Sequence, residues 1–406
     1  MLIRRCGVLW LEPREVAHFD LDRLLSGETG VVSDQCWYAH APHLAAPIEI
    51  GQEATMLLGS LSPSDWVDDA SVRKDHATVL EAMLSAGLVV SFAEDAAGSR
   101  GADDEVRAQH WHGLAAVSHF SSRWEGIDAA GEVVEAGLDT GPALRERFGP
   151  PPAANHDVAG NGEAIMLDRP QRTPLDDLLD ARGTCRNFDT GTPMERAAFA
   201  KVLDRTFGVR GNARIADDFD VVKKTSPSGG AMHPTEPYLI VRSVDGIAPG
   251  LYHYRASEHA LQPLPFDMRN LPPGAERHPV SARKTPLDYL AWIAVGGQQW
   301  FADAHALVVM APRFARNFWK YRNHAKAYRV CILDVGHLSQ TLLLTATELG
   351  LGAYITAAIN EVDIERAFGL THYVHGPLAV CGFGPRADTM VTSEFDPNRK
   401  VWPRKA

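Results

Sequence analysis

Hydrophobic positions near the beginning of the chain recur at helical spacing and then run together as in a buried strand. Apolar residues within 79–84 are spaced for one face of a helix, and Gly87 is placed to end that helix. The apolar run 88–90 follows and predicts a strand. Upstream, residues 62–65 offer an N-cap serine followed by proline, which predicts a helix start.

The order helix, helix, strand resembles a winged helix-turn-helix, so residues 1–100 are predicted to form a winged-helix-like N-terminal domain. Such folds often bind DNA, but the acidic balance of this chain argues against that use. Two roles remain open for the domain. It could bind a peptide or a partner protein, or it could pack against the rest of the chain without any ligand.

Glycine, alanine, aspartate and proline become frequent from about residue 94 to residue 168, which is typical of loops. We therefore interpret residues 101–170 as a linker and packing segment. His110, His112 and His119 lie within it, but no carboxylate or cysteine stands at a spacing that completes a metal site. No metal is predicted, and the aromatic residues here are expected to pack on the domain that follows.

Helical and strand patterns alternate from about Pro174 onward, which predicts a second domain, of mixed α+β class, over residues 171–406. The predicted elements are a helix that begins with the capping pattern of 192–195 and ends at 207–208, buried strands at 238–244 and 307–310, and a long apolar helix at 323–349. A helix that is apolar on nearly all sides belongs in a core or an obligate interface.

Composition narrows the possible functions. The 406 residues are 45% apolar and 22% charged, which suits a globular protein of two domains, and the net charge of −11 disfavours a nucleic acid partner. Five scattered cysteines form no C-x-x-C pair, and no apolar run reaches the length of a membrane span or a signal peptide. We expect a cytoplasmic protein with reduced thiols and no membrane partner.

Four segments of the second domain carry groups suited to chemistry. Arg182 and Arg186 flank Thr184, and guanidinium and hydroxyl groups suit a phosphate. The adjacent glycines of 226–230 let main chain approach a flat ligand closely. Each pattern also has an ordinary explanation, a solvated helix face for the arginines and a simple turn for the glycines.

The third segment places Lys320 beside Tyr321, ahead of the long apolar helix. A lysine ammonium next to a phenol favours the phenolate, which can then take a proton from carbon. The fourth segment, 349–354, is a helix end whose glycines again permit close approach. A solvated helix start remains the alternative for the Lys-Tyr pair.

Taken in order, these segments resemble the nitroreductase family, and within it the SagB-type dehydrogenases and peptide-maturation dehydrogenases, which oxidise heterocycles in ribosomally made peptides. Residues 182–188 resemble the entry motif R-x-S-x-R-x-F, with Thr184 in place of serine, and 226–231 resembles P-S-G-G-A. The remaining matches are the hairpin at 250–254 and the run K-Y…Y-R…L-D-x-G-H-x-x-Q, carried by 320–321, 327–329 and 333–340. Ordinary nitroreductases have Asn where Ala231 stands and Gln where His233 stands, which favours the SagB-type resemblance.

The resemblance covers about 174–386 and implies a nitroreductase fold that binds FMN at a homodimer interface. It implies catalysis by Lys320 and Tyr321. The cofactor-binding residues that it implies are Arg182, Thr184, Arg186, Ser226, Pro227, Ser228, Gly229, Gly230, Gln340, Gly350 and Gly352.

The activity implied by the resemblance is FMN-dependent dehydrogenation of an azoline to an azole in a modified precursor peptide. Tyr321 removes the proton next to the carbonyl, hydride passes from the adjacent ring carbon to FMN, and dioxygen reoxidises the flavin to give peroxide. A cyclodehydratase or another maturation enzyme is a candidate partner. Two alternatives stand beside this reading: an NAD(P)H-dependent nitro- or quinone reductase, and a non-catalytic scaffold of a peptide-modifying complex.

Overall fold

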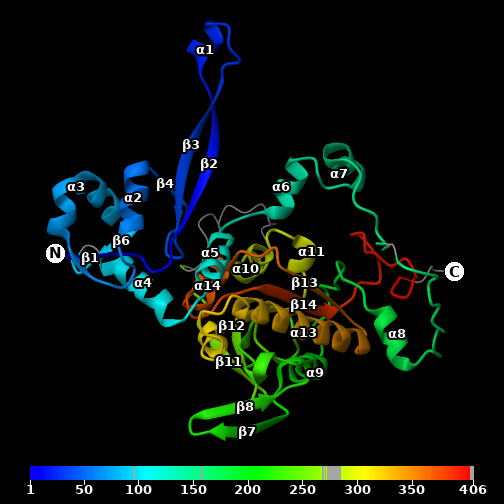
Figure 1. The fold of residues 1–406 in the computed structure, drawn as a ribbon. Coiled ribbons are helices and arrows are strands. Elements are labelled where there is room, and N and C mark those ends of the chain that lie inside the picture. Colours follow the sequence, from blue (N-terminus) through cyan, green and yellow to red (C-terminus); the bar gives the residue numbers. More distant parts are fainter. Residues whose placement is uncertain are drawn as a thin grey trace. The chain divides into compact units, whose positions relative to one another are not determined.

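The computed structural model describes residues 1–402 except 95–96, 157, 159, 268, 270 and 272–284. Within it the chain forms two compact units (Figure 1). Unit 1 consists of Met1–Arg123 and Phe314–Cys331, and unit 2 of Trp124–Arg313 and Ile332–Ala406.

This division differs from the predicted domain boundaries in two respects. The first part of the predicted linker, through Arg123, belongs to unit 1 and forms helices, and the segment that carries Lys320 and Tyr321 also clusters with unit 1. Contacts between residues far apart in the sequence produce this grouping, and such contacts leave no mark on local composition.

A small sheet and two helices form the core of unit 1. Strand β1 (Leu2–Arg5) pairs antiparallel with β5 (Val67–Asp68) and with β6 (Val89–Ser91). Helices α2 (Gln52–Ser60) and α3 (Asp69–Ser85) supply apolar side chains to the same core. The predicted strand at 88–90 is confirmed by β6 with a shift of one residue, and Gly87 has a positive φ of 73° just after α3. The winged-helix interpretation stays a prediction.

The helix start expected at 62–65 is wrong. Ser62 Oγ accepts the backbone N–H groups of Ser64 (3.1 Å) and Asp65 (2.9 Å), which makes a local turn. Helix α3 begins at Asp69, where Asp68 caps the backbone N–H of Ala70. Serine and aspartate close turns with the same hydrogen bond that caps helices, so the two uses look alike in the sequence.

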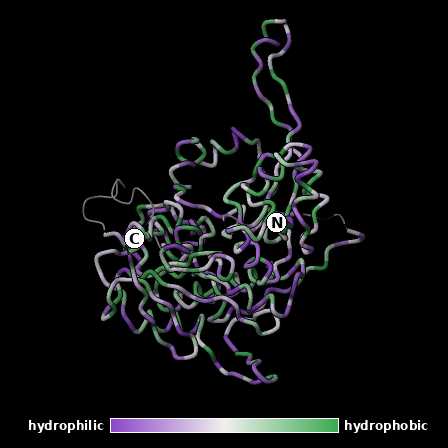
Figure 2. Tube along the Cα trace, turned by 90° about the vertical axis from the view of Figure 1, so that its left-hand side faces the viewer, coloured by the Kyte–Doolittle hydropathy of each residue, from purple (hydrophilic) through white to green (hydrophobic). Residues whose placement is uncertain are grey.

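Unit 1 also contains an arm that the hydrophobic pattern did not reveal. Strands β2 (Trp10–Phe19) and β3 (Val31–His40) form a ten-residue antiparallel hairpin with the short helix α1 (Leu21–Leu25) at its tip, and β4 (Ile48–Ile50) pairs with the base of β3. Hydrophobic and hydrophilic residues are interspersed along the arm (Figure 2). The other helices of unit 1 are α4 (Ala97–Ala108), α5 (Gly113–Ser121) and α12 (Phe314–Phe318).

A six-stranded sheet in the order β11-β10-β9-β12-β14-β13 is the centre of unit 2, and every neighbouring pair is antiparallel. Its strands are β9 (Thr235–Val241), β10 (Gly250–Arg255), β11 (Ala260–Leu264), β12 (Ala306–Pro312), β13 (Leu351–Thr356) and β14 (Ala379–Pro385). The strands predicted within 238–244 and 307–310 are confirmed as β9 and β12.

Side chains along a strand point alternately to opposite faces of the sheet. Both faces of this sheet therefore present apolar side chains, and helices cover each face. Leu239 and Val308 pack in a cluster that includes side chains of α9 (Arg196–Phe207) and α13 (Ala327–Glu348). Ile240 and Leu307 pack in a second cluster with α10 (Pro286–Ala294), α11 (Gln299–Ala302) and α14 (Glu361–Phe368). The remaining elements of unit 2 are α6 (Ala129–Glu135), α7 (Gly141–Phe148), α8 (Pro174–Ala181), η1 (Gly229–Ala231) and the hairpin β7 (Gly211–Ala216) and β8 (Phe219–Lys223).

Two predicted helices are present, but each begins at a later residue than the sequence predicts. The first is α9, which begins after Glu195 instead of at the Thr192 cap, because Met194 donates its N–H to Ser243 O (3.1 Å) as an isolated bridge. The long helix expected at 323–349 is α13. Among the described residues α13 alone has the length and hydropathy of a membrane span, but half of that apolar window is buried within the protein.

Candidate functional site

The Ser226–Gly230 turn in unit 2 is fastened to α13 by two side chains. Ser228 Oγ donates to Asp334 Oδ2 (2.5 Å), and the same carboxylate accepts the backbone N–H of Gly229. Ser226 Oγ lies 2.8 Å from Thr341 Oγ1. Asp334 is 3% exposed, and its burial raises its pKa. Both serine side chains therefore hold the turn in place against α13.

The backbone after this turn is held in an unusual conformation. Gly230, Ala231 and His233 have φ values of 62°, 58° and 43°, and the His233 N–H donates to Ser228 Oγ (2.9 Å). Residues other than glycine adopt positive φ at a cost of about 1–3 kcal/mol each, and such residues cluster where a ligand is held. The strain at Ala231 and His233 supports the predicted contact of this segment with a flat ligand.

Lys224, two residues before the turn, is a cation that the site prediction omitted. It is 6% exposed, and no side-chain hydrogen bond or ion pair is seen for it in the described part of the chain. Burial lowers the pKa of its ammonium, with an opposing influence from Glu236. A buried, unpaired cation destabilises a protein unless it serves a ligand. A positive charge next to the turn suits the electron-rich edge of a reduced flavin.

We expect Lys224→Met to stabilise the fold and to weaken flavin binding. Removing a buried unpaired charge from a functional site raises the free energy of unfolding by about 0.5–2 kcal/mol. Because the folded-state pKa of Lys224 is lowered, the unfolded state binds more protons, so wild-type stability rises with pH up to the ordinary lysine range. The advantage of the methionine variant should therefore shrink as pH rises. Thermal unfolding against pH, with Lys223→Met as control, measures this, and a destabilised variant at pH 7 would contradict the argument.

The entry segment brings Arg182, Thr184 and Arg186 beside the start of β13. Arg182 caps the C-terminus of α8, and Thr184 forms an isolated parallel bridge with Ala353. No ion pair of Arg182 is found among the described residues, so its charge is available. Arg186 is engaged, because its Nη1 donates to Ser393 O (2.9 Å). Of the two predicted phosphate-binding arginines, Arg182 is the one without a competing partner.

A carboxylate that the prediction did not include holds the C-terminal segment against this entry segment. Glu394 accepts hydrogen bonds from the Arg186 backbone N–H (2.6 Å), Asn187 Nδ2 (2.8 Å) and Trp402 Nε1 (2.8 Å), and it also pairs with Arg386. Its side chain is only 3% exposed. Arg386 is thereby neutralised by Glu394.

The two predicted glycines near β13 have structural roles of their own. Gly350 has a φ of 72° and follows the last turn of α13. A Cβ on Gly352 would lie 2.3 Å from Cys185 Sγ, so the close packing of the entry segment on β13 requires glycine there. Gln340 is exposed on α13, on a face that also presents Ile332 and Leu333. The predicted ligand contacts of these residues remain predictions.

Lys320 and Tyr321 belong to unit 1, so they are described apart from the other predicted residues. Their backbone N–H groups both donate to Asn317 O (3.2 Å each), and Asn317 Nδ2 donates to Ala327 O (2.8 Å). Asn317 is fully buried and thus fixes both ends of the loop that carries the pair. The Lys320 ammonium lies 5.6 Å from the centre of the Tyr321 ring, within the range of a cation–π contact.

An aromatic cluster in unit 1 supports this loop from within. Trp111 contacts Phe314, Phe318 and Tyr328 at ring-centre distances of 4.5, 4.7 and 5.5 Å, and His119 Nδ1 lies 2.9 Å from Tyr328 Oη. The aromatic residues of 101–123 therefore pack on the Lys-Tyr segment. In the described ranges no group of three His, Cys, Asp or Glu residues could hold a metal ion.

The sequence of this chain matches one family model and is similar to three known proteins. The model of the nitroreductase family matches residues 179–385, about half of the chain. A nitroreductase relative from Methanocaldococcus jannaschii is 24% identical over 229 residues, which is 56% of this chain and all of that protein.

The other two relatives are named for peptide processing. The trifolitoxin-processing protein TfxB of Rhizobium leguminosarum bv. trifolii is 29% identical over 159 residues, which is 39% of this chain and 38% of that protein. The microcin B17-processing protein McbC of Escherichia coli is 25% identical over 177 residues, 43% of this chain and 58% of that protein.

Proposed function

Because the chain belongs to the nitroreductase family, we propose that it is an FMN-dependent oxidoreductase that converts an azoline in a ribosomally made, modified peptide to an azole. The observation that carries the flavin part is the Ser226–Gly230 turn, which Asp334 fixes, with strained backbone after it and Lys224, unpaired among the described residues, before it. The relatives named for trifolitoxin and microcin B17 processing, together with the SagB-type motifs, support a peptide substrate.

The residues of unit 2 have the chemistry that FMN needs. Arg182 and Thr184 would bind the phosphate, and the main chain of 226–230 would meet the hydrogen-bonding edge of the ring, with Lys224 beside it. When bound, FMN supplies the acceptor for the hydride that leaves the heterocycle. In this proposal Arg186 also binds the phosphate only if its hydrogen bond to Ser393 O is replaced by one to the phosphate.

Tyr321 is proposed to take the second hydrogen, as a proton, from the ring carbon next to the carbonyl. Tyr321 would do so as the phenolate, and the Lys320 ammonium would stabilise the negative charge that passes to the substrate as the proton leaves carbon. Asn317 accepts both backbone N–H groups, so the backbone that carries the pair is held in place before substrate arrives. Dioxygen is the proposed final electron acceptor, reduced to peroxide.

We also propose that the chain works as a homodimer, with a precursor peptide and a cyclodehydratase as partners. The exposed face of α13 carries Ile332 (48% exposed) and Leu333 (55%) beside Gln340, and apolar side chains at this exposure favour an interface. Light scattering of the flavin-loaded protein, whose chain mass is 44.3 kDa, decides between monomer and dimer.

The test of the proposed function is anaerobic mixing of purified, yellow protein with an azoline peptide. The flavin absorbance should bleach in a single turnover and return in air, and denaturation should release FMN. The match over the full length of the M. jannaschii nitroreductase relative favours one alternative, a reductase that uses NAD(P)H. That alternative is supported instead if NAD(P)H bleaches the flavin quickly and the peptide does not.

A further inference from the structure

Unit 1 contains a cavity of about 570 Å³, within the range of roughly 300–1,000 Å³ that is typical of ligand sites. Its walls are the connection between β1 and β2, the end of α4, the first turn of α5 and Asn323. Asn323 lies two residues after Tyr321 in the loop that carries the proposed catalytic pair. The cavity therefore borders that loop.

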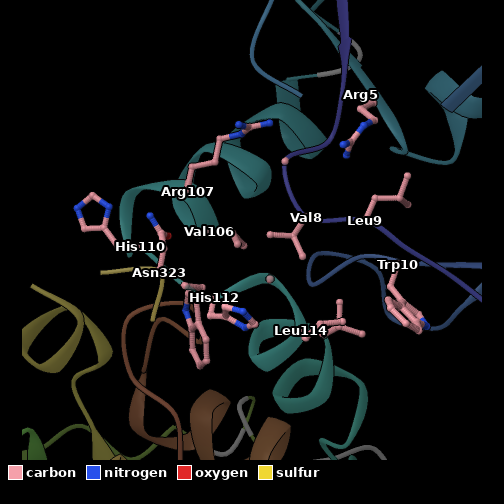
Figure 3. Close-up of a pocket in the computed structure, with 14 residues that line it drawn as sticks. Arg5, Val8, Leu9, Trp10, Val106, Arg107, His110, His112, Leu114 and Asn323 are labelled. Atoms are coloured by element: carbon pink, nitrogen blue, oxygen red, sulfur yellow. The ribbon is translucent and has the colours of Figure 1, made fainter. Parts of the chain in front are cut away.

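Polar and apolar side chains both line the cavity. Figure 3 shows Arg107, His110 and Asn323 on one side, and Leu9, Trp10 and Leu114 on the other, with Arg5 above Leu9. Trp10 and Leu114 are 46% and 54% exposed, so the apolar side is open to solvent. A ligand that suits this lining carries an apolar group next to a polar or charged one.

The charge of the lining is positive, although the chain as a whole carries −11. Arg5, Arg107 and two histidines line the cavity, and none of the described residues in its lining is acidic. Arg107 shares Asp103 with Arg4, which also pairs with Asp104. Arg5 donates only to the main-chain oxygens of Leu61 and Cys6 (3.1 Å each) and has no carboxylate partner in the described part of the chain. One guanidinium charge thus remains for an anionic ligand.

The joint between the cavity and the Tyr321 loop is strained. His110 and Asn323 have φ values of 58° and 51°, and the Asn323 N–H donates to His110 O (3.0 Å). Positive φ in residues other than glycine persists where the surroundings enforce it, and such sites are often ligand clamps. A ligand in the cavity would contact the same segment that positions Tyr321.

From these observations we propose that the cavity binds a segment of the substrate peptide that has an aspartate or glutamate next to an apolar residue. The carboxylate meets Arg5, and the apolar side chain lies on Trp10 and Leu114. This inference rests on the proposed function for its peptide, and it assigns the peptide's recognition site. Charge complementarity selects an acidic segment over a basic one.

The test uses fluorescent hexapeptides, acetylated and amidated at their ends, that contain Leu-Glu, Leu-Gln or Leu-Lys and are otherwise identical. Anisotropy with the full chain should give a Kd for the Leu-Glu peptide about tenfold lower than for the Leu-Gln peptide, as expected for one charge-assisted contact. Leu114→Glu places a carboxylate at the exposed apolar side and should weaken Leu-Glu binding about tenfold or more. The matched control is Leu144→Glu, at an exposed leucine in the first turn of α7.

Equal affinity for the Leu-Glu and Leu-Gln peptides, or unchanged binding by Leu114→Glu, overturns the inference. A Leu-Gln peptide with a free C-terminus carries its carboxylate at the chain end instead of on a side chain. If this peptide binds more tightly than the capped Leu-Glu peptide, the inference is also overturned. The flavin content and azoline bleaching of the same preparations report the proposed function separately. If the purified protein contains no FMN but still binds Leu-Glu more tightly than Leu-Gln, the proposed oxidation is refuted and the peptide-binding cavity is supported.

Discussion

Tyr321→Phe should retain FMN but slow peptide oxidation about 10²–10⁴-fold, the usual loss when a general base is removed. The substitution removes only the hydroxyl group of the side chain, and the backbone N–H of residue 321 still donates to Asn317 O. The loop should therefore keep its conformation. Single-turnover bleaching of the flavin by an azoline peptide under anaerobic conditions measures the rate, and Tyr38→Phe, elsewhere in unit 1, is the matched control.

Lys320→Ala should slow the same step, because the ammonium over the Tyr321 ring would no longer stabilise the negative charge that passes from the phenolate to the substrate. Lys326→Ala is its control, since Lys326 is an exposed lysine in the same loop. If Tyr321→Phe and Lys320→Ala bleach at the wild-type rate, the pair is a solvated part of the loop and not the catalytic machinery. The non-catalytic scaffold would then gain support.

The sequence predicted the elements of unit 2 well wherever one local rule decides them. Strands β9 and β12 are buried apolar runs, and α9 ends at Gly208 as expected. Helix starts were less accurate. Near Thr192, the backbone of Met194 bonds to Ser243 instead of entering the helix. A capping pattern states what a side chain can do, but tertiary bonds decide whether the backbone is free to do it.

Four residues that shape the candidate site were not chosen from the sequence. Asp334, Asn317 and Glu394 act on segments 10 to 208 residues away along the chain, through bonds that only the fold reveals. Lys224 stands next to Lys223 in the sequence, yet one is buried and the other exposed. The run L-D-x-G-H-x-x-Q was a usable signal for Asp334, because a buried aspartate in an apolar helix needs partners.

The grouping of the Lys-Tyr segment with unit 1 also follows from through-space contacts. Trp111 and His119 pack against Phe314, Phe318 and Tyr328, a set that joins residues about 200 positions apart. Composition marked 101–170 as a linker because it is rich in glycine, alanine and proline. The few aromatic residues in its first part are enough to give that part a core, which average composition hides.

Arg182→Ala should lower FMN affinity about 10- to 100-fold, whereas Arg186→Ala should have a smaller effect. A hydrogen bond to a charged group contributes about 1.5–3 kcal/mol, and every 1.4 kcal/mol is a factor of ten in affinity. The difference between the two arginines follows from their partners. Arg182 has no ion pair among the described residues, but Arg186 must first release Ser393 O, to which it donates at 2.9 Å.

Titration of flavin-free protein with FMN, followed by flavin fluorescence, measures both affinities. Arg172→Ala is the control, because that exposed arginine pairs with Asp177 and Asp180 on the surface of α8. The double variant Arg182→Ala/Arg186→Ala should retain almost no flavin after gel filtration. If Arg182→Ala binds FMN as tightly as wild type while Arg186→Ala does not, the phosphate contacts Arg186, and the segment at 392–394 must move when the cofactor binds.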